Sequence, residues 1–485
     1  MRPSPGIESM CAVPCDYHSN RRRFLSQTAS GFGLIALSNL LGVNPVQGLS
    51  MPPAGVLGGT HFAPKAKRVI YLFQSGGPSH LDLFDYKPVL RDQHGKDMPA
   101  SVLGTQRVSL MTREKGRRTF ASPFKFSQHG ASGAWVTELM PHTAGVVDDL
   151  CFINSLQTEP INHDPAVTFI QTGRAISGRP AFGSWMHYGL GNASQNLPAY
   201  VVMISGNADQ PILSRYYHNG FLPSRYQGVQ FQSAGDPVLF LSNPTGIDHE
   251  NRGRIISTIN QLNTFQHERS GDPEIEARID SFELAYRMQT SVPDLMNLKS
   301  EPKEILDMYG PEVTKPGSFA YQCLMARKLA ERDVRFVQIF HAGWDHHGGL
   351  KEGMIRQCKA SDQPSAALIK DLKMRGMLDD TLVVWGGEFG RTAYSQGDDL
   401  NGRDHHPRCY SIWMAGGGIR RGIRIGATDD FGYNVTDNVI YVRDLHATML
   451  HLLGIDHQRF TFKNQGLDDK LTGVEPARII QEILA

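Results

Sequence analysis

Short apolar runs alternate with longer amphipathic segments along most of the chain after about residue 65. Runs rich in β-branched and aromatic residues predict buried strands over residues 68–74, 150–155, 200–205, 334–340 and 381–385. Helical periodicity predicts helices over residues 165–171, 251–298 with a break near 271–273, 318–332, 352–375 and 444–453. Asp444 is the candidate N-cap of the last helix. This alternation favours an α/β fold: a doubly wound, mainly parallel sheet with helices on both faces.

Two segments interrupt the pattern. Residues 92–132 and 212–248 are rich in Gly, Pro, Ser and Arg, and we interpret them as insertions or long loops over a functional site. A length of 485 residues alone would suggest about three domains. No Pro/Ser-rich linker or internal repeat divides the chain, so we expect a single domain over residues 65–485.

The N-terminal residues predict export. The run RRRFL at residues 21–25 resembles a twin-arginine signal, with Arg21 and Arg22 as the pair, and an apolar stretch follows at residues 31–42. No Asp or Glu occurs between Asp16 and Asp82. The apolar stretch is too short to span a bilayer, so residues 1–50 are expected to be a signal peptide with its flank and the protein to be periplasmic or secreted.

Composition and net charge limit the classes of binding partner that we expect. The formal net charge of +1 and the isoelectric point near 7.7 give no reason to expect a nucleic acid or an anionic membrane surface. Four cysteines lie outside the predicted leader: Cys151, Cys323, Cys358 and Cys409. They contain no CxxC pair, which excludes a zinc knuckle and argues against a disulfide scaffold, while one or two disulfide bonds stay open.

Most of the candidate chemistry lies in three glycine-bounded stretches: GWDHHG at residues 343–348, GEFGRT at 387–392 and GRDHHP at 402–407. The first two directly follow predicted strands. Acids and imidazoles on loops at the carboxyl ends of strands are what an open α/β sheet uses to build a metal site. No GxGxxG, Walker or serine-elbow motif competes with them.

These stretches, together with GGPSHLDLFDYKP at residues 76–88, resemble a bacterial exported family known as domain of unknown function fifteen-oh-one. Many members of that family carry a twin-arginine leader. The family is itself regarded as similar to the alkaline phosphatase and sulfatase superfamily. The resemblance implies an alkaline-phosphatase-like α/β fold, metals at the strand ends and hydrolysis of phosphate or sulfate esters.

The superfamily resemblance extends to single positions. Residues 163–174, HDPAVTFIQTGR, have the length of the sulfatase nucleophile stretch, with Pro165 and residues 172–174 in register. His163 therefore stands where the superfamily has Ser, Thr or a modified Cys, and Val167 stands where sulfatases have Arg.

The same resemblance implies metal ligands. Asp345, His347 and a histidine of residues 402–407 correspond to the ligands of one metal, and Glu388 corresponds to the acid of another. Three departures accompany these matches: Val167 as described above, Gln74 in place of the usual first-strand Asp, and Phe389 in place of the neighbouring imidazole. We therefore expect the first metal site to be complete and the other to be altered.

Backbone alternation supports the first site. Along an extended loop, Asp345 and His347 point one way while His346 points the other. Two imidazoles and a carboxylate would make a zinc-like hydrolytic site that lowers the pKa of bound water to about 7; the alternative is a loop closed by hydrogen bonds among its own polar groups. Zinc is the metal we expect, with calcium or manganese as alternatives.

Two choices stay open. Either His405 or His406 could complete the site, and we favour His405 because it follows Asp404, whereas His406 precedes a proline that restricts its backbone. Glu388 needs a partner once buried, either a metal or Arg391, and a purely structural Glu388–Arg391 ion pair is the alternative.

Candidate catalytic roles fall to His163, Arg174 and Arg391. We expect His163 to be a metal ligand or an anion contact rather than a covalent nucleophile, because no adjacent base is visible. Arg391 or Arg174 would stabilise developing negative charge. The polar side chains of the first loop are weaker candidates: His80, Asp82 and Asp85.

Two functional hypotheses result. The first is an exported metal-dependent hydrolase of phosphate or sulfate esters, acting on small molecules or polysaccharides. The other is a non-catalytic exported metal-binding protein that keeps the alkaline-phosphatase-like fold, for which the altered positions Gln74, His163 and Phe389 speak. The oligomeric state and the physiological substrate are left open by the sequence.

Overall fold

The computed structural model describes residues 55–106, 116–206, 211–232, 236–238, 241–397 and 399–485. The leader predicted for residues 1–50 lies outside these ranges.

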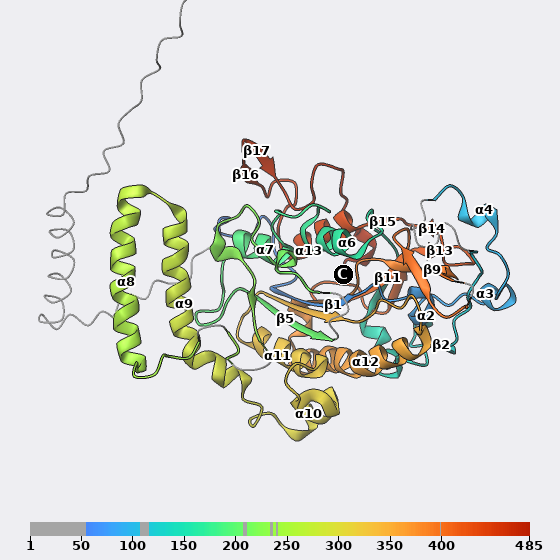
Figure 1. Ribbon diagram of the computed structural model, residues 1–485, viewed down its shortest axis with the longest axis horizontal. Coiled ribbons are helices and arrows are strands. Elements are labelled where there is room, and N and C mark those ends of the chain that lie inside the picture. Colours follow the sequence, from blue (N-terminus) through green and yellow to red (C-terminus); the bar gives the residue numbers. More distant parts are fainter. Residues whose placement is uncertain (1–54, 107–115, 207–210, 233–235, 239–240, 398) are drawn as a thin grey trace, which may run out of the picture.

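A central sheet runs through the molecule (Figure 1). Its described strands lie in the order β12-β4-β11-β8-β1-β7-β5-β6, with β15 beside β4. Their bounds are β1 Arg68–Ser75, β4 Cys151–Gln157, β5 Tyr200–Gly206, β6 Val229–Gln230, β7 Phe336–Ala342, β8 Thr381–Gly386, β11 Tyr410–Ala415, β12 Ile423–Ile425 and β15 Ile440–Tyr441. All neighbouring pairs are parallel except those that β11 makes with β4 and β8. The mainly parallel sheet predicted from the sequence is confirmed.

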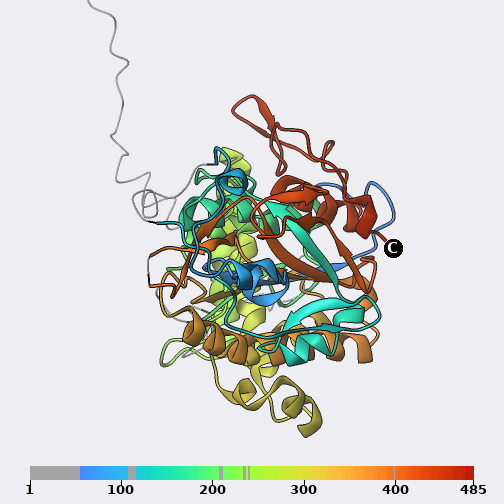
Figure 2. The same cartoon turned by 90° about the vertical axis from the view of Figure 1, so that its right-hand side faces the viewer.

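Helices cover both faces of this sheet (Figures 1 and 2). On one face lie α5 Pro141–Ala144, α10 Lys303–Tyr309, α11 Phe319–Glu331 and α12 Leu350–Met374; on the other lie α6 His163–Thr172, α7 Phe182–Leu190 and α13 Val442–Leu452. Strand β1 shows why two layers form. Ile70 and Leu72 pack with residues of α11 and α12, whereas Val69, Tyr71 and Phe73 pack with residues of α6, α7 and α13. Each large apolar side chain so buried contributes about 1.5–3 kcal/mol.

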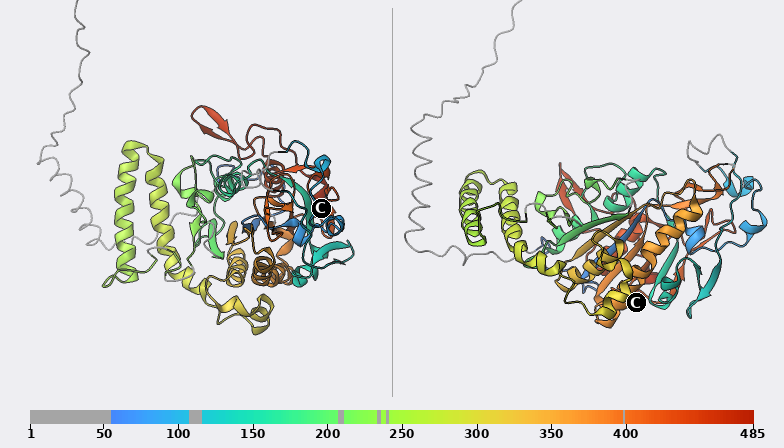
Figure 3. Two further views of the ribbon diagram at one scale, coloured as in Figure 1. Left: turned by 45° about the vertical axis from the view of Figure 1, so that its right-hand side comes forward. Right: turned by 60° about the horizontal axis from the view of Figure 1, so that its bottom comes forward.

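A long helical hairpin stands apart from the sheet (Figures 1 and 3). It consists of α8 His249–Ser270 and α9 Pro273–Met296. The break predicted near residues 271–273 is present, with Gly271 in the left-handed region at φ 66°.

The start of α13 differs from the prediction. Tyr441 is the N-cap, and Asp444 sits at the third helical position, where its carboxylate accepts the Tyr441 N–H at 3.0 Å. The assignment of Asp444 as N-cap was therefore wrong. An acid three residues into a helix can bond back to the cap residue, so a capping position and its reciprocal partner are hard to distinguish in the sequence.

The two predicted insertions lie beside the functional loops. The first insertion begins where α3 Val89–Asp92 ends, and it contains α4 Ala100–Leu103 and β2 Phe126–His129. It reaches β9 through a bridge between Thr119 and Tyr394. The other contributes β6 to the sheet edge and the 3-10 turn Ser214–Tyr216, next to the start of α6. The α-helix of the described ranges not yet named is α2 His80–Leu83. The strands not yet named are β3 Ala134–Thr137, β9 Gly390–Ser395, β10 Arg403–His406, β13 Ala427–Thr428, β14 Val435–Asp437, β16 Phe462–Asn464 and β17 Leu467–Asp469.

Two further features of the described residues concern the cysteines and the helices. Cys151, Cys323, Cys358 and Cys409 are all buried and free. None of the helices in the described ranges combines the length and apolar character needed to cross a membrane.

Candidate metal centre

The functional loops meet at the carboxyl ends of three neighbouring parallel strands, β8, β1 and β7. Gly76, just after β1, has φ 114°, and a Cβ on it would lie 2.7 Å from the backbone nitrogen of Asp345. Only glycine therefore lets the loop after β1 pack against the loop after β7.

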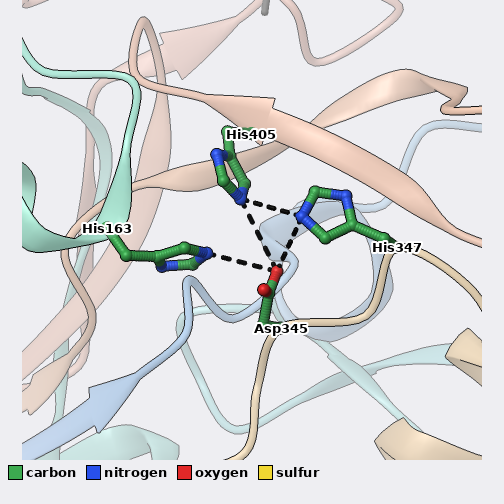
Figure 4. A group of neighbouring side chains, drawn as sticks. All are labelled: His163, Asp345, His347 and His405. Carbon is green, nitrogen blue, oxygen red and sulfur yellow. Dashed lines mark hydrogen bonds and ion pairs between the residues drawn. The ribbon is translucent and has the colours of Figure 1, made fainter. Parts of the chain in front are cut away.

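Four side chains converge at this edge (Figure 4). They are His163 at the start of α6, Asp345 and His347 in the loop after β7, and His405 on β10, and one ligand atom of each lies within 4.8 Å of the others. Asp345 Oδ1 is 3.0 Å from His347 Nε2, 3.2 Å from His163 Nε2 and 3.6 Å from His405 Nε2. The Nε2 atoms of His347 and His405 are 2.9 Å apart. We call these four residues the His/Asp cluster.

The neighbouring histidines point elsewhere. His406 directs Nε2 at the Tyr433 carbonyl, 2.7 Å away, and its ring stacks on Tyr433. His346 is buried against Gly353 of α12. The structure thus places His405, and not His406, in the cluster, and it shows the expected alternation along the loop after β7.

Two of the imidazoles form a hydrogen bond through Nδ1, the ring nitrogen that faces away from Asp345. His163 Nδ1 lies 2.6 Å from Glu388 Oε1, and His405 Nδ1 lies 2.8 Å from the Ile161 carbonyl. Each acceptor favours the tautomer with its hydrogen on Nδ1, which leaves the Nε2 lone pair facing the cluster. A carboxylate or carbonyl behind an imidazole in this way is typical of metal-binding histidines.

Glu388 is fully buried. Besides His163, it accepts the backbone N–H of Gly76 at 3.0 Å. The alternative interpretation, a Glu388–Arg391 ion pair, is wrong, because the guanidinium of Arg391 pairs with Asp345 instead, at 2.6 Å. The sequence places Glu388 and Arg391 three residues apart, but it could not show that the bend between β8 and β9 directs their side chains to different partners.

Each nitrogen of the Arg391 guanidinium also donates to a backbone carbonyl. Nε donates to Gly77 O at 2.9 Å, and the terminal nitrogens donate to Gly76 O and, at 3.3 Å, to Arg403 O. Its side chain is almost completely buried. It therefore orients Asp345 and joins three loops, instead of facing an anionic substrate as the sequence suggested.

Arg174 is not brought to the cluster. It follows α6, a helix of ten residues that begins at His163 and rises by about 15 Å along its length. Its guanidinium lies against Gly473.

Two of the altered superfamily positions, Gln74 and Phe389, are used for packing. The buried Gln74 donates to Leu72 O at 3.1 Å and accepts from Trp344 Nε1 at 3.0 Å. The Phe389 ring centroid lies 4.8 Å from that of His163 and 4.6 Å from that of His405. Among the described residues, the His/Asp cluster is the one group of His, Cys, Asp and Glu side chains gathered closely enough to hold a metal.

The ionisation of the side chains in the His/Asp cluster favours binding of a cation there. Burial opposes ionisation of Asp345, but hydrogen bonds from His163, His347 and His405 and the charge of Arg391 hold its pKa well below the ordinary value. Burial lowers the pKa of His405 to about 4. Burial also acts to lower the pKa of His163, yet hydrogen bonds to Asp345 and Glu388 outweigh it and raise that pKa.

The donor set fits a divalent metal. Three imidazole nitrogens and one carboxylate oxygen match the ligand chemistry of zinc, whereas calcium takes six to eight oxygen ligands. His347 Nδ1 is buried without a hydrogen-bond partner among the described residues, so no protein group there fixes its tautomer. A cation at the Nε2 atoms would satisfy lone pairs that otherwise face one another.

No pattern in the sequence pointed to the β9–β10 hairpin that delivers His405. His405 lies opposite Arg391 in it, which brings residues 387–392 and 402–407 together. A buried ion pair holds the hairpin, with Asp82 Oδ2 2.7 Å from Arg403 Nε and both side chains fully buried.

The other candidates of the first loop serve the fold. His80 Nε2 lies 3.0 Å from Gly432 O, and Asp85 accepts from Thr428 at 2.5 Å.

Residues 66–484 match the model of a family described as "Protein of unknown function (DUF1501)". Similar solved structures include a protein in the alkaline phosphatase superfamily from Vibrio parahaemolyticus, with 11% identity, a TM-score of 0.35, and 90% of this chain and 73% of that chain covered. Another is the zinc complex of the C-terminal periplasmic domain of EcEptC from Escherichia coli, with 8% identity, a TM-score of 0.35, and 87% and 92% covered. A third is the lipoteichoic acid synthase LtaP from Listeria monocytogenes, with 10% identity, a TM-score of 0.34, and 89% and 80% covered. No curated protein matches the chain significantly.

Proposed function

This chain belongs to the DUF1501 family, as its four motifs predicted, and we propose that it is an exported metal-dependent hydrolase of phosphate or sulfate esters. The observation that carries the proposal is the convergence of three imidazole Nε2 atoms on one carboxylate oxygen of Asp345. Side chains gathered in this way, at the carboxyl ends of parallel strands, are typical of a metal site in an α/β protein.

In this proposal His163, Asp345, His347 and His405 hold one divalent metal, with zinc as the expected ion. The metal would supply Lewis acidity at the edge of the sheet. Glu388 sets the orientation of His163 and Arg391 that of Asp345, so both act through the ligands they hold. Glu388 itself, predicted as a ligand, is placed behind His163 rather than at the point of convergence.

The hydrolytic part of the proposal has two supports. The motif order along the chain resembles that of the alkaline phosphatase and sulfatase superfamily, whose chemistry is ester hydrolysis. The cluster is also open to solvent on one side, since the side chains of Asp345 and His347 keep 22% and 26% of their accessible surface. A small-molecule or polysaccharide ester could therefore reach it.

A non-catalytic metal-binding protein is the other candidate, and one observation favours it. Neither arginine proposed to stabilise negative charge is turned toward a substrate at the cluster: each guanidinium nitrogen of Arg391 donates to a backbone carbonyl, one of them also to Asp345, and Arg174 lies at the far end of α6. Catalysis of anionic ester hydrolysis usually depends on such donors.

Metal content and turnover separate these possibilities. We expect purified protein to hold about one equivalent of a divalent metal, most of it lost in His347→Ala and in His405→Ala. His406→Gln is the matched control, because it changes an adjacent imidazole that faces Tyr433. Full metal content in His347→Ala would refute the metal site. Turnover is then measured on a panel of aryl phosphate and aryl sulfate esters, and metal-loaded protein that hydrolyses none of them would leave the non-catalytic candidate.

A further inference from the structure

A cavity of about 470 Å³ lies between the loop after β7 and the first two turns of α12. Its polar walls are Asp345, His346, Glu352 and Arg356, and the rest of the lining consists of glycines from the same loop and helix. The cavity shares Asp345 with the His/Asp cluster, but its other side chains take no part in that cluster.

His346 is the unusual member of this lining. Its side chain is only 6% exposed, and its Nε2 atom is buried without a hydrogen-bond partner among the described residues. A Cβ on Gly353 would overlap the imidazole at Nε2, so glycine at that position lets the ring lie directly on α12. Nε2 therefore faces the helix and not the cavity, to which the ring contributes a buried wall.

Glu352 and Arg356 are four residues apart on α12 and therefore share one face of the helix. Despite this spacing, neither side chain forms an ion pair or a hydrogen bond with any residue in the described ranges. Both charged groups are thus free to bind a ligand. The first turn of α12 adds the backbone N–H groups of residues 351 and 352, which have no acceptor within the helix, whereas Leu350 N–H donates to Asn401 O.

We propose that this cavity binds a neutral, hydroxyl-rich group, such as a sugar ring. The free carboxylate of Glu352 and the free guanidinium of Arg356 balance each other, while Asp345 is already paired with Arg391. An anion would have to sit beside Glu352, and the acidic and imidazole groups here are not gathered closely enough to hold a further cation. The lining has no hydrophobic side chain, which excludes an apolar ligand.

Sugar hydroxyls fit the charged groups on the walls. They donate to Glu352, and they accept from Arg356 and from the helix N-terminus. If the sugar is the alcohol part of an ester substrate, that role rests on the proposed function. The binding of a neutral sugar by the cavity is independent of the proposed function.

The test uses metal-loaded protein and saturation-transfer NMR with four neutral probes: methyl α-D-glucopyranoside, methyl β-D-galactopyranoside, methyl α-D-mannopyranoside and myo-inositol. We expect a signal from at least one probe and its loss, by at least tenfold, in Arg356→Ala and in Glu352→Ala. The matched control is Glu250→Ala with Arg254→Ala, because these residues form an exposed pair with the same spacing on α8.

Three outcomes would overturn the inference: no saturation of any probe, an unchanged signal in both α12 variants, or displacement of the bound probe by millimolar inorganic phosphate or sulfate. Elemental analysis keeps the inference apart from the proposed function. The α12 variants should retain metal, whereas His347→Ala should lose metal and still bind the probe.

Discussion

Replacement of Glu388 by glutamine tests whether the imidazole of His163 is held for metal binding. Glu388 Oε1 lies 2.6 Å from His163 Nδ1, and the carboxylate also accepts Gly76 N–H, all inside a fully buried pocket. Glutamine keeps one acceptor oxygen and nearly the same volume. It removes the negative charge, and it places an amide donor where the other carboxylate oxygen now lies 3.3 Å from the Gly76 nitrogen.

The magnitude follows from these contacts. A hydrogen bond to a charged partner contributes about 1.5–3 kcal/mol, roughly twice a neutral one. Loss of a partner behind a metal-binding histidine typically weakens metal affinity by about 10- to 100-fold. Since each tenfold change corresponds to about 1.4 kcal/mol, we expect the metal affinity of Glu388→Gln to fall by about 1.4–2.8 kcal/mol.

The assay is a competition between the apo-protein and a chromophoric chelator for zinc, with circular dichroism to show that the variant is folded. Asp362→Asn is the matched control. Asp362 is another buried carboxylate that accepts two backbone N–H groups at 2.8 Å, from His142 and Thr143, but it touches no residue of the His/Asp cluster. Wild-type zinc affinity in a folded Glu388→Gln would refute the reasoning, as would an equal loss in Asp362→Asn.

Two further predictions concern stability and export. Asp82→Asn leaves the buried guanidinium of Arg403 without a counter-charge and should lower the free energy of unfolding by about 3–5 kcal/mol, measured by urea denaturation at pH 7. Burial opposes ionisation of Asp82, but Arg403 holds the pKa of this carboxyl below the ordinary value. The ionised carboxylate therefore contributes its full stabilisation above the unfolded pKa of about 4, and this contribution is lost as the pH falls toward the folded pKa. If Asp82→Asn left the loss of unfolding free energy at acid pH unchanged, this reasoning would be contradicted. Replacement of both Arg21 and Arg22 by lysine should keep the protein in the cytoplasm, and unchanged export in cell fractionation would remove the twin-arginine interpretation.

The layer structure could be predicted because it depends on local apolar runs. The stretch at residues 68–74 is apolar on both faces, which predicts a strand covered on both sides, and β1 is such a strand. The short pairings that complete the sheet had no comparable signal. Strands β6 and β15 are only two residues long and β12 has three, so their places depend on the elements that surround them.

The cluster could be predicted only as far as loop position determines side-chain position. Asp345 and His347 follow a predicted strand and alternate with His346, so their common direction was accessible from the sequence. The partners behind the ligands were not. Ile161 and Gly76 contribute only backbone atoms, and Arg391 reaches Asp345 although 46 residues separate them in the sequence. Such contacts depend on the tertiary structure, and the spacing of residues along the sequence does not reveal them.

The altered positions bear most directly on mechanism. A further metal would need ligands where Gln74 and Phe389 lie, yet the Gln74 amide is held by Trp344 and by Leu72 O, and the Phe389 ring packs against two imidazoles of the cluster. Neither position can become a ligand without breaking a buried contact. The same ring lies beside His163, whose Nδ1 is taken by Glu388, so His163 has one nitrogen left and directs it at Asp345. A histidine held on both sides in this way is better placed to bind a metal than to accept a phosphoryl or sulfuryl group, which favours a single-metal centre without a covalent step.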